Sequence, residues 1–146
     1  MIDPRAPRFA ATITSVVLAA VLVTSSLWLL ALQVAVFASA AIWGVRSSPY
    51  ARLYARAIRP RLGPPADLED ERPPRFAQAV GLGFSIIGLV GLLTALSGLF
   101  YVPIAAAFVA AFLNAAFGFC LGCEVYLLAL RAISRPSASR PEVTAP

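Results

Sequence analysis

Two long stretches without a charged residue constrain the fold of this chain more than any other feature. They cover residues 9–45 and 76–123. Because about 20 helical residues cross a hydrocarbon core of roughly 30 Å, each stretch has room for two membrane-spanning helices. Apolar residues make up 60% of the chain and charged residues 13%, which is typical of a protein that crosses a membrane several times. We therefore predict an all-α membrane protein.

Small and polar residues divide the two stretches into four expected spans. The first stretch should turn near Ser25 and the second near Ser97, with Pro103 beginning the fourth helix because proline suits a helix start. The expected spans are residues 9–25, 27–45, 75–96 and 102–123.

The distribution of arginine predicts the orientation of these spans. All twelve basic residues are arginine, and the chain has no histidine. They precede the first span, lie in the middle loop or follow the last span, while the two short turns carry no charge. By the positive-inside rule we expect a multi-pass membrane protein with both termini and the middle loop in the cytoplasm.

The missing residue types exclude several classes of site. A chain without lysine cannot form the usual P-loop phosphate site or a Schiff base. Without histidine it cannot form a Ser-His-Asp triad, a His-ligated haem or a mixed Cys/His zinc site. The remaining chemistry is that of thiols, carboxylates and arginines, and we expect no bound cofactor and no metal ligands.

Residues 49–62 of the middle loop have the pattern of a short amphipathic helix. Apolar Leu53, Ala57 and Ile58 alternate with Arg52, Arg56 and Arg59. A helix of this kind can lie on anionic lipid headgroups, so these three arginines are predicted to form a surface for lipid or for a soluble partner.

An internal repeat relates the two halves of the chain. Residues 3–11 recur in residues 71–78, each copy leading into Pro-Arg-Phe-Ala. Two spans separate the copies, so both should begin on the same side of the membrane, as in a parallel repeat with a pseudo-twofold axis along the membrane normal. We predict one domain with halves at residues 3–62 and 71–133, a linker at 63–70 and a disordered tail at 134–146. Its architecture would be four transmembrane helices in two parallel-repeat hairpins with a cytoplasmic amphipathic loop helix.

The two cysteines, Cys120 and Cys123, form the main candidate site together with Glu124. On a helix the three share a face. The pair could cycle between dithiol and disulfide with Glu124 as proton acceptor, carry sulfur as a persulfide, or bind a soft metal; cysteines also serve as small apolar packing residues. If a new helix begins at Leu121, the thiols lie at its positive end, which lowers a thiol pKa; if the fourth span continues unbroken, they gain no such help.

Four further residues are assigned to the site from the repeat and from small-residue spacing. The first half carries Arg46 where the second carries the thiols, so the pseudo-twofold axis should bring this guanidinium opposite the cysteines and favour thiolate. Asn114 is a mid-span amide and predicts a polar interior. Gly118 and Gly122 belong to a stripe of small residues suited to close helix packing.

These motifs together resemble a known family. The paired Pro-Arg-Phe-Ala starts, the Arg-Ser-Ser-Pro-Tyr segment, the Pro-Arg-Leu-Gly-Pro-Pro linker and Phe-Gly-Phe-Cys-Leu-Gly-Cys-Glu are similar to those of small bacterial integral membrane proteins classed as domain of unknown function 4395. The resemblance covers residues 3–130 and implies a location in the bacterial inner (plasma) membrane. It implies genes encoded near thioredoxin-like proteins and rhodanese-type sulfurtransferases, and hence a role for Cys120 and Cys123 in thiol or sulfur traffic.

We predict a thiol-redox or sulfur-relay component that acts at the cytoplasmic membrane edge. Two other functions stay open: a non-enzymatic anchor or scaffold for a soluble thioredoxin-like or sulfurtransferase-like partner, and a small transporter subunit. The expected surroundings are the lipid bilayer and a cytoplasmic thioredoxin-like or rhodanese-like protein, with no nucleic acid. The sequence does not specify the oligomeric state.

Overall fold

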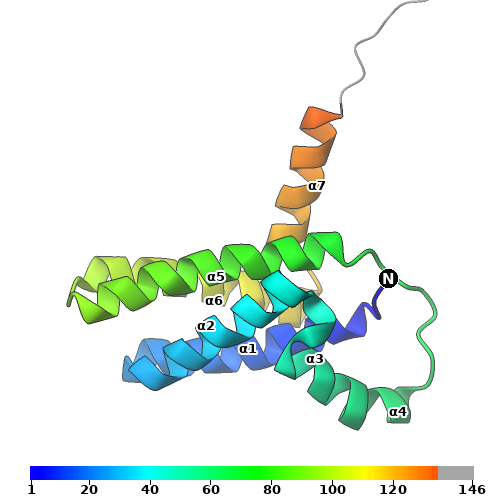
Figure 1. Cartoon of the computed structure of the whole chain (residues 1–146), viewed down its shortest axis with the longest axis horizontal. Coiled ribbons are helices and arrows are strands. Elements are labelled where there is room, and N and C mark those ends of the chain that lie inside the picture. The colour runs from blue at the N-terminus through cyan, green and yellow to red at the C-terminus, as the bar shows by residue number, and fades with distance from the viewer. Residues whose placement is uncertain (135–146) are drawn as a thin grey trace, which may run out of the picture.

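The computed structural model describes residues 1–134, and its regular elements are helices (Figure 1). The prediction of an all-α chain is therefore confirmed over these residues. In chain order the elements are α1 (Arg5–Thr24), α2 (Leu27–Trp43), a 3₁₀ turn η1 (Val45–Ser47), α3 (Pro49–Leu53), a π-helical turn η2 (Tyr54–Ile58), α4 (Arg59–Leu62), α5 (Arg72–Leu93), α6 (Ser97–Phe117) and α7 (Leu121–Ile133). The tail predicted at 134–146 lies, from residue 135 on, outside the described residues.

Four long helices form the body of the molecule. Helices α1 and α2 make one hairpin and α5 and α6 the other, with both hairpin turns at the same end (Figure 1). Helix α1 packs against α6, α2 against α5, and α5 against α6. The buried core consists mainly of Leu18, Val21, Leu30, Phe100 and Ile104. Burying such side chains contributes about 1.5–3 kcal/mol each relative to a watery surface, but against lipid the close packing matters more.

Three of the described helices, α1, α5 and α6, are long and apolar enough to cross a membrane; they have 20, 22 and 21 residues. Helix α2 is equally apolar but has 17 residues, because it ends at Gly44 with φ +96°. The chain therefore leaves the helix two residues before the predicted end of the second span at residue 45. An L-residue is strained at such a φ, which suits glycine.

The fourth helix begins earlier than predicted, so Pro103 lies inside it and does not start it. The preceding turn is short because Ala95 takes a left-handed φ of +56°. Gly91 makes this turn possible, since a Cβ there would overlap the backbone of Leu99 and Phe100. Ser97 can therefore begin α6 directly after the turn. Helix α5 also begins and ends earlier than the predicted span of residues 75–96, since it runs from Arg72 to Leu93.

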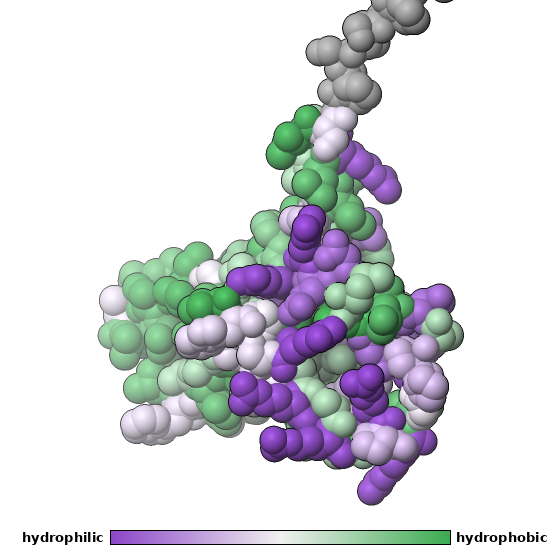
Figure 2. Space-filling model, turned by 45° about the vertical axis from the view of Figure 1, so that its right-hand side comes forward, coloured by the Kyte–Doolittle hydropathy of each residue, from purple (hydrophilic) through white to green (hydrophobic). Residues whose placement is uncertain are grey.

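Polar and apolar residues separate along the bundle. The half that holds the two hairpin turns is covered by apolar and weakly polar side chains, whereas strongly hydrophilic side chains gather at the opposite end, where α3, α4 and the N-terminus lie (Figure 2). Large apolar side chains such as Val23, Trp28 and Leu93 are 85%, 83% and 66% exposed. Such a band of exposed apolar side chains is what a lipid-facing surface requires.

The predicted amphipathic helix at 49–62 is present as a continuous helical segment of α3, η2 and α4. The π-helical turn precedes Pro60, whose missing N–H cannot complete a regular helix, and the Arg59 N–H donates to the Tyr54 carbonyl instead. Ala51 and Tyr54 face the bundle and are buried, while Leu53 is 50% exposed. The helix ends at Gly63, whose φ is +69°.

The two hairpins contact each other in matching ways. The Arg8 guanidinium at the start of α1 donates to the carbonyls of Ala115 and Ala116, at distances of 3.1 and 3.3 Å, near the end of α6. The Arg75 guanidinium at the start of α5 donates to the carbonyls of Ala41 and Ile42, at 2.8 and 2.7 Å, near the end of α2. Each arginine thus satisfies carbonyls that have no partner within their own helix and offsets the negative end of its dipole.

The aromatic residues after these arginines also match. The ring centroids of Phe9 and Tyr54 lie 5.6 Å apart with an interplanar angle of 47°. Those of Phe76 and Tyr126 lie 5.6 Å apart at 44°. Helix α1 therefore holds the helical segment that follows α2, and α5 holds α7, through the same kind of aromatic pair.

Candidate functional site

The helical backbone is interrupted between α6 and α7, and this interruption places both cysteines at the start of a new helix. Gly118 ends α6 in the left-handed region, with φ +67°, and its N–H donates to the Asn114 carbonyl at 3.0 Å. Cys120 then has extended backbone, and α7 begins at Leu121. Of the two alternatives left open by the sequence, the structure has the one with a broken helix. The predicted fourth span to residue 123 is wrong because α6 ends at Phe117.

The cysteines occupy the first turn of α7 and are joined by a disulfide. Cys120 is the N-cap residue, and its Sγ accepts a hydrogen bond from the Cys123 backbone N–H at 3.3 Å. The two Cα atoms lie 5.2 Å apart, within the ordinary range for a disulfide. A sulfur at this position faces the unpaired N–H groups and the positive end of the helix dipole, which favour thiolate over thiol in the reduced form.

Helix α7 leaves the bundle at a steep angle and rests on the start of α5 (Figure 1). Gly122, between the two cysteines, makes the closest approach: a Cβ built there would lie 2.6 Å from the Ala77 Cβ. One turn further on, Tyr126 packs on Phe76. The position of the disulfide is therefore set by α5 as well as by the end of α6.

Two pockets meet at the disulfide. One, called the polar pocket here because charged side chains line part of it, has a volume of about 300 Å³ and is bordered by Arg5, Arg8, Glu69 and both cysteines. The other is largely apolar, has a volume of about 390 Å³ and lies between α1, α2, α5, α6 and the start of α7. Cys120 lines both, as do the amide side chains of Gln78 and Asn114. The disulfide therefore separates a charged pocket from an apolar one.

The N-terminal segment fixes the positive side of the polar pocket. Arg5 donates to Asp3 at 3.1 and 3.2 Å and to the Gly63 carbonyl at 3.2 Å. Burial by itself would raise the pKa of Asp3, but hydrogen bonds from Arg5 and Tyr54 outweigh it and hold the pKa of this carboxyl below its ordinary value. Burial and the hydrogen bond to Asp3 raise the pKa of the Tyr54 hydroxyl. Both groups are therefore in their usual charge states near neutral pH.

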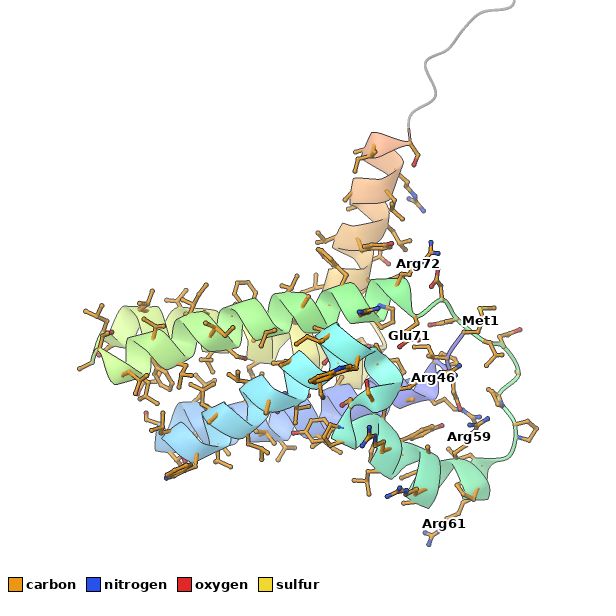
Figure 3. All side chains as sticks on the ribbon, in the orientation of Figure 1. Met1, Arg46, Arg59, Arg61, Glu71 and Arg72 are labelled. Atoms are coloured by element: carbon orange, nitrogen blue, oxygen red, sulfur yellow. A yellow bond between two sulfur atoms is a disulfide. The ribbon has the colours of Figure 1, made fainter. Side chains whose placement is uncertain are left out.

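The structure does not bring Arg46 to the cysteines. Its guanidinium donates to the Met1 carbonyl, and the two residues lie together at the polar end in Figure 3. Arg46 lines a separate pocket of about 350 Å³ with Arg52 and Arg59. The reason is that Gly44 and the turn η1 come between α2 and α3. The residue that precedes α3 is Ser48, so Ser48, and not Arg46, stands where Cys120 stands before α7.

The other predicted site residues lie in different surroundings. Glu124 is exposed in the first turn of α7 and lines neither pocket at the disulfide. Asn114 lies on α6 between the two pockets, Gly118 ends α6, and Gly122 packs on α5. The three loop arginines Arg52, Arg56 and Arg59 are exposed on the helical segment α3 to α4.

Two residues of this site were not singled out from the sequence. Gln78 is an amide in an uncharged span, the same signal that identified Asn114, and it directly follows the second Pro-Arg-Phe-Ala copy. Arg8 belongs to the first copy of that motif. Its contact with the end of α6 depends on which helices pack together, so the sequence pattern alone could not place it.

Among the described residues 1–134, no group of three or more cysteine, histidine or acidic side chains is arranged to hold a metal ion. Comparison with curated proteins and with solved structures gave no match. The family model described as Domain of unknown function (DUF4395) matches residues 2–131. This match covers nearly the whole chain and agrees with the resemblance drawn from the motifs. The chain belongs to the DUF4395 family.

Proposed function

We propose that this protein is a thiol–disulfide exchange component of the bacterial inner membrane, with Cys120 and Cys123 as its redox pair. The observation that carries the proposal is the placement of both sulfur atoms in the first turn of α7, on the wall of a pocket that also contains Arg5 and Arg8. A helix N-terminus and nearby guanidinium groups both favour thiolate, the form that reacts in exchange. A cysteine that serves only for packing needs neither.

The proposal places four spans in the membrane, including α2, as two parallel repeats. The matching contacts of Arg8 and Arg75 and the matching aromatic pairs support a pseudo-twofold relation between the hairpins. The arginines of residues 1–134 lie away from the hairpin turns near Ser25 and Ala95, and the positive-inside rule assigns that arginine-rich end to the cytoplasm. The disulfide would then face cytoplasmic thiol proteins.

Exchange with a dithiol partner follows from the geometry. A partner thiolate attacks the Cys123 Sγ, and the S–S bond breaks with its electron pair passing to the Cys120 Sγ. Cys120 is the better leaving group because its thiolate is stabilised by the Cys123 N–H and by the helix N-terminus. The partner's second thiol then attacks the partner's own sulfur in the mixed disulfide and releases Cys123. Two electrons and two protons pass from the partner to this protein.

Redox titration of the purified protein in lipid nanodiscs tests this function. We expect a single two-electron thiol couple that is lost in Cys120→Ser and in Cys123→Ser. In Cys123→Ala, Cys120 should titrate below the ordinary thiol pKa of about 8.5. A decrease of about one unit raises the thiolate fraction at pH 7 roughly eightfold and, after the accompanying loss of nucleophilicity, the alkylation rate about threefold.

The matched control is Cys120→Ala, which leaves Cys123 inside the first turn of α7, where it is not the capping residue. Its alkylation should be slower at pH 7. Equal alkylation rates with ordinary thiol pKa values for both variants, and no two-electron couple, would refute the redox function. The anchor or scaffold function would then be favoured.

A further inference from the structure

The apolar pocket beside the disulfide is the strongest unassigned feature of the molecule. We infer that it binds a lipid-soluble quinone, which accepts the two electrons of the Cys120–Cys123 dithiol. This inference rests on the proposed thiol-redox function and names the second substrate of the same site.

The position of the pocket favours a ligand that comes from the bilayer. Its volume of about 390 Å³ suits a small planar ring. Its rim is formed by apolar side chains that are partly exposed: Phe76 is 36%, Val80 37%, Leu121 37% and Val125 53% exposed. A water-soluble substrate would meet these side chains before reaching the sulfur, whereas a molecule dissolved among acyl chains would not. The polar pocket on the other side of Cys120 leaves a separate approach for a protein thiol.

Small residues create the space for the ring. Ala106, Ala107, Ala110 and Ala111 of α6 line the pocket, and Ala77 and Gly81 of α5 complete it. From the sequence, Gly118 and Gly122 were expected to belong to a stripe of small residues that supports close helix packing. Gly122 packs closely on Ala77, whereas Ala106 and Ala110 border a hollow.

Two amides supply the polar groups that a quinone needs. Gln78 and Asn114 both line this pocket, and both residues are partly exposed. Each amide carries N–H donors that can form a hydrogen bond with a bound ligand. A quinone carbonyl accepts such a hydrogen bond, whereas a lipid acyl chain does not. The amides therefore distinguish a quinone from a pocket that only holds lipid.

The reaction balances without another reactant. The two thiols lose two electrons and two protons as the S–S bond between Cys120 and Cys123 forms. The quinone takes up both electrons and both protons, and its two carbonyl oxygens become the hydroxyls of a quinol. A cytoplasmic dithiol partner then reduces the disulfide again by the exchange described above. The net reaction is oxidation of a protein dithiol by a membrane quinone.

The test uses the full chain in nanodiscs, reduced and freed of reductant, with a fully substituted benzoquinone that carries a decyl tail. Full substitution prevents addition of a thiol to the ring. We expect one quinone reduced per disulfide formed, followed by quinone absorbance and by the mass of alkylated protein. Cys120→Ser and Cys123→Ser should each abolish the reaction.

Pocket variants decide where the quinone reacts. Ala106→Phe projects a ring into the pocket from an exposed position and should slow quinone reduction at least about tenfold. Ala79→Phe adds the same ring on an exposed face of α5 outside the pocket and should change the rate less than about twofold. Gln78→Leu removes one amide and should raise the quinone concentration needed for half-maximal rate. Ala106→Phe and Ala79→Phe, which lie outside the polar pocket, should exchange with a soluble dithiol at the wild-type rate.

Two results would overturn the inference. One is equal quinone reduction by wild type, Ala106→Phe and Gln78→Leu. The other is normal exchange with a soluble dithiol but no quinone reduction, which would leave the proposed function in place with a different electron acceptor. If the wild-type protein shows neither exchange with a soluble dithiol nor quinone reduction, the proposed function itself is refuted.

Discussion

The contact between Gly122 and α5 should decide whether α7 stays docked, and Gly122→Ala tests it. A Cβ at residue 122 would lie 2.6 Å from the Ala77 Cβ and 2.7 Å from the Ala77 Cα, whereas ordinary contacts begin at 3.4 Å. The obstruction is helix backbone and cannot rotate away, so α7 must move by about 1 Å. Overpacking of this kind costs about 1–3 kcal/mol. That is a large part of what can hold α7, since no residue of this helix is buried.

Hydrogen exchange of the backbone amides of α7 measures this cost directly. A loss of 1–3 kcal/mol in docking free energy should accelerate exchange roughly 5- to 150-fold. Amides of α5 should be unaffected. The control is Gly83→Ala, because a Cβ at this helical glycine meets nothing within 4 Å. That variant should leave α7 unchanged and stabilise α5 slightly, by up to about 1 kcal/mol.

Gly122→Ala should also distinguish quinone reduction from exchange with a soluble dithiol. With α7 displaced from α5, Cys120 no longer borders the apolar pocket, so quinone reduction should fall. Exchange with a soluble dithiol should persist, because the first turn of α7 and its N-terminal N–H groups remain. Identical α7 protection in Gly122→Ala and wild type would show that the contact with Ala77 does not hold the helix, and that this account of how the site is positioned is wrong.

Three further predictions concern the arrangement of the chain. Arg75→Gln should lower the free energy of unfolding by about 1 kcal/mol in denaturant titrations, because it removes two hydrogen bonds to the end of α2; Arg61→Gln, a change at an exposed residue of α4, should have no effect. Because the pKa of Asp3 is lowered from 3.8, its stabilising contribution is present above about pH 3.8 and is lost as the pH falls through the lower folded value, which a pH series of N-terminal exchange would detect; constant protection down to pH 2 would contradict it. In a cysteine-free background, an impermeant maleimide outside intact cells should label Ser25→Cys but not Ala66→Cys, and labelling of the second would reverse the proposed orientation.

The helical content could be predicted because it depends on local features, whereas several of the predicted span boundaries differ from the helix ends by three to six residues. Uncharged stretches, proline at helix starts and glycine at helix ends all act within a few residues. The predictions failed where backbone geometry depends on a tertiary contact. Pro103 lies inside α6 because Gly91 lets the chain turn tightly. Helix α2 ends at Gly44, where the Glu71 carboxylate accepts a hydrogen bond from the Val45 N–H at 2.6 Å.

The candidate site was predicted in part. Cys120 and Cys123 are a pair, as their spacing indicated, and the glycine before them does break the helix. The sequence could not place Arg46, because aligning the ends of the two halves requires knowing where each second helix stops. In the structure α2 ends at Gly44 and α6 at Gly118. When the segments that follow these two ends are aligned, Ser48 corresponds to Cys120 and Tyr54 corresponds to Tyr126. This registration shifts Arg46 away from the thiols.

The difference between these two segments explains why the cysteines lie where they do. After α2, the segment that begins at Pro49 packs against α1, and its residues Ala51 and Tyr54 are both buried. After α6, the corresponding segment α7 has no buried residue and touches α5 mainly through Gly122 and Tyr126. The same local plan therefore packs the segment after α2 closely against α1, whereas at the same end of the bundle it leaves pockets on two sides of the first turn of α7. A disulfide can exchange electrons only where reactants reach it, and of the two segments α7 is the one that leaves its first turn open on two sides.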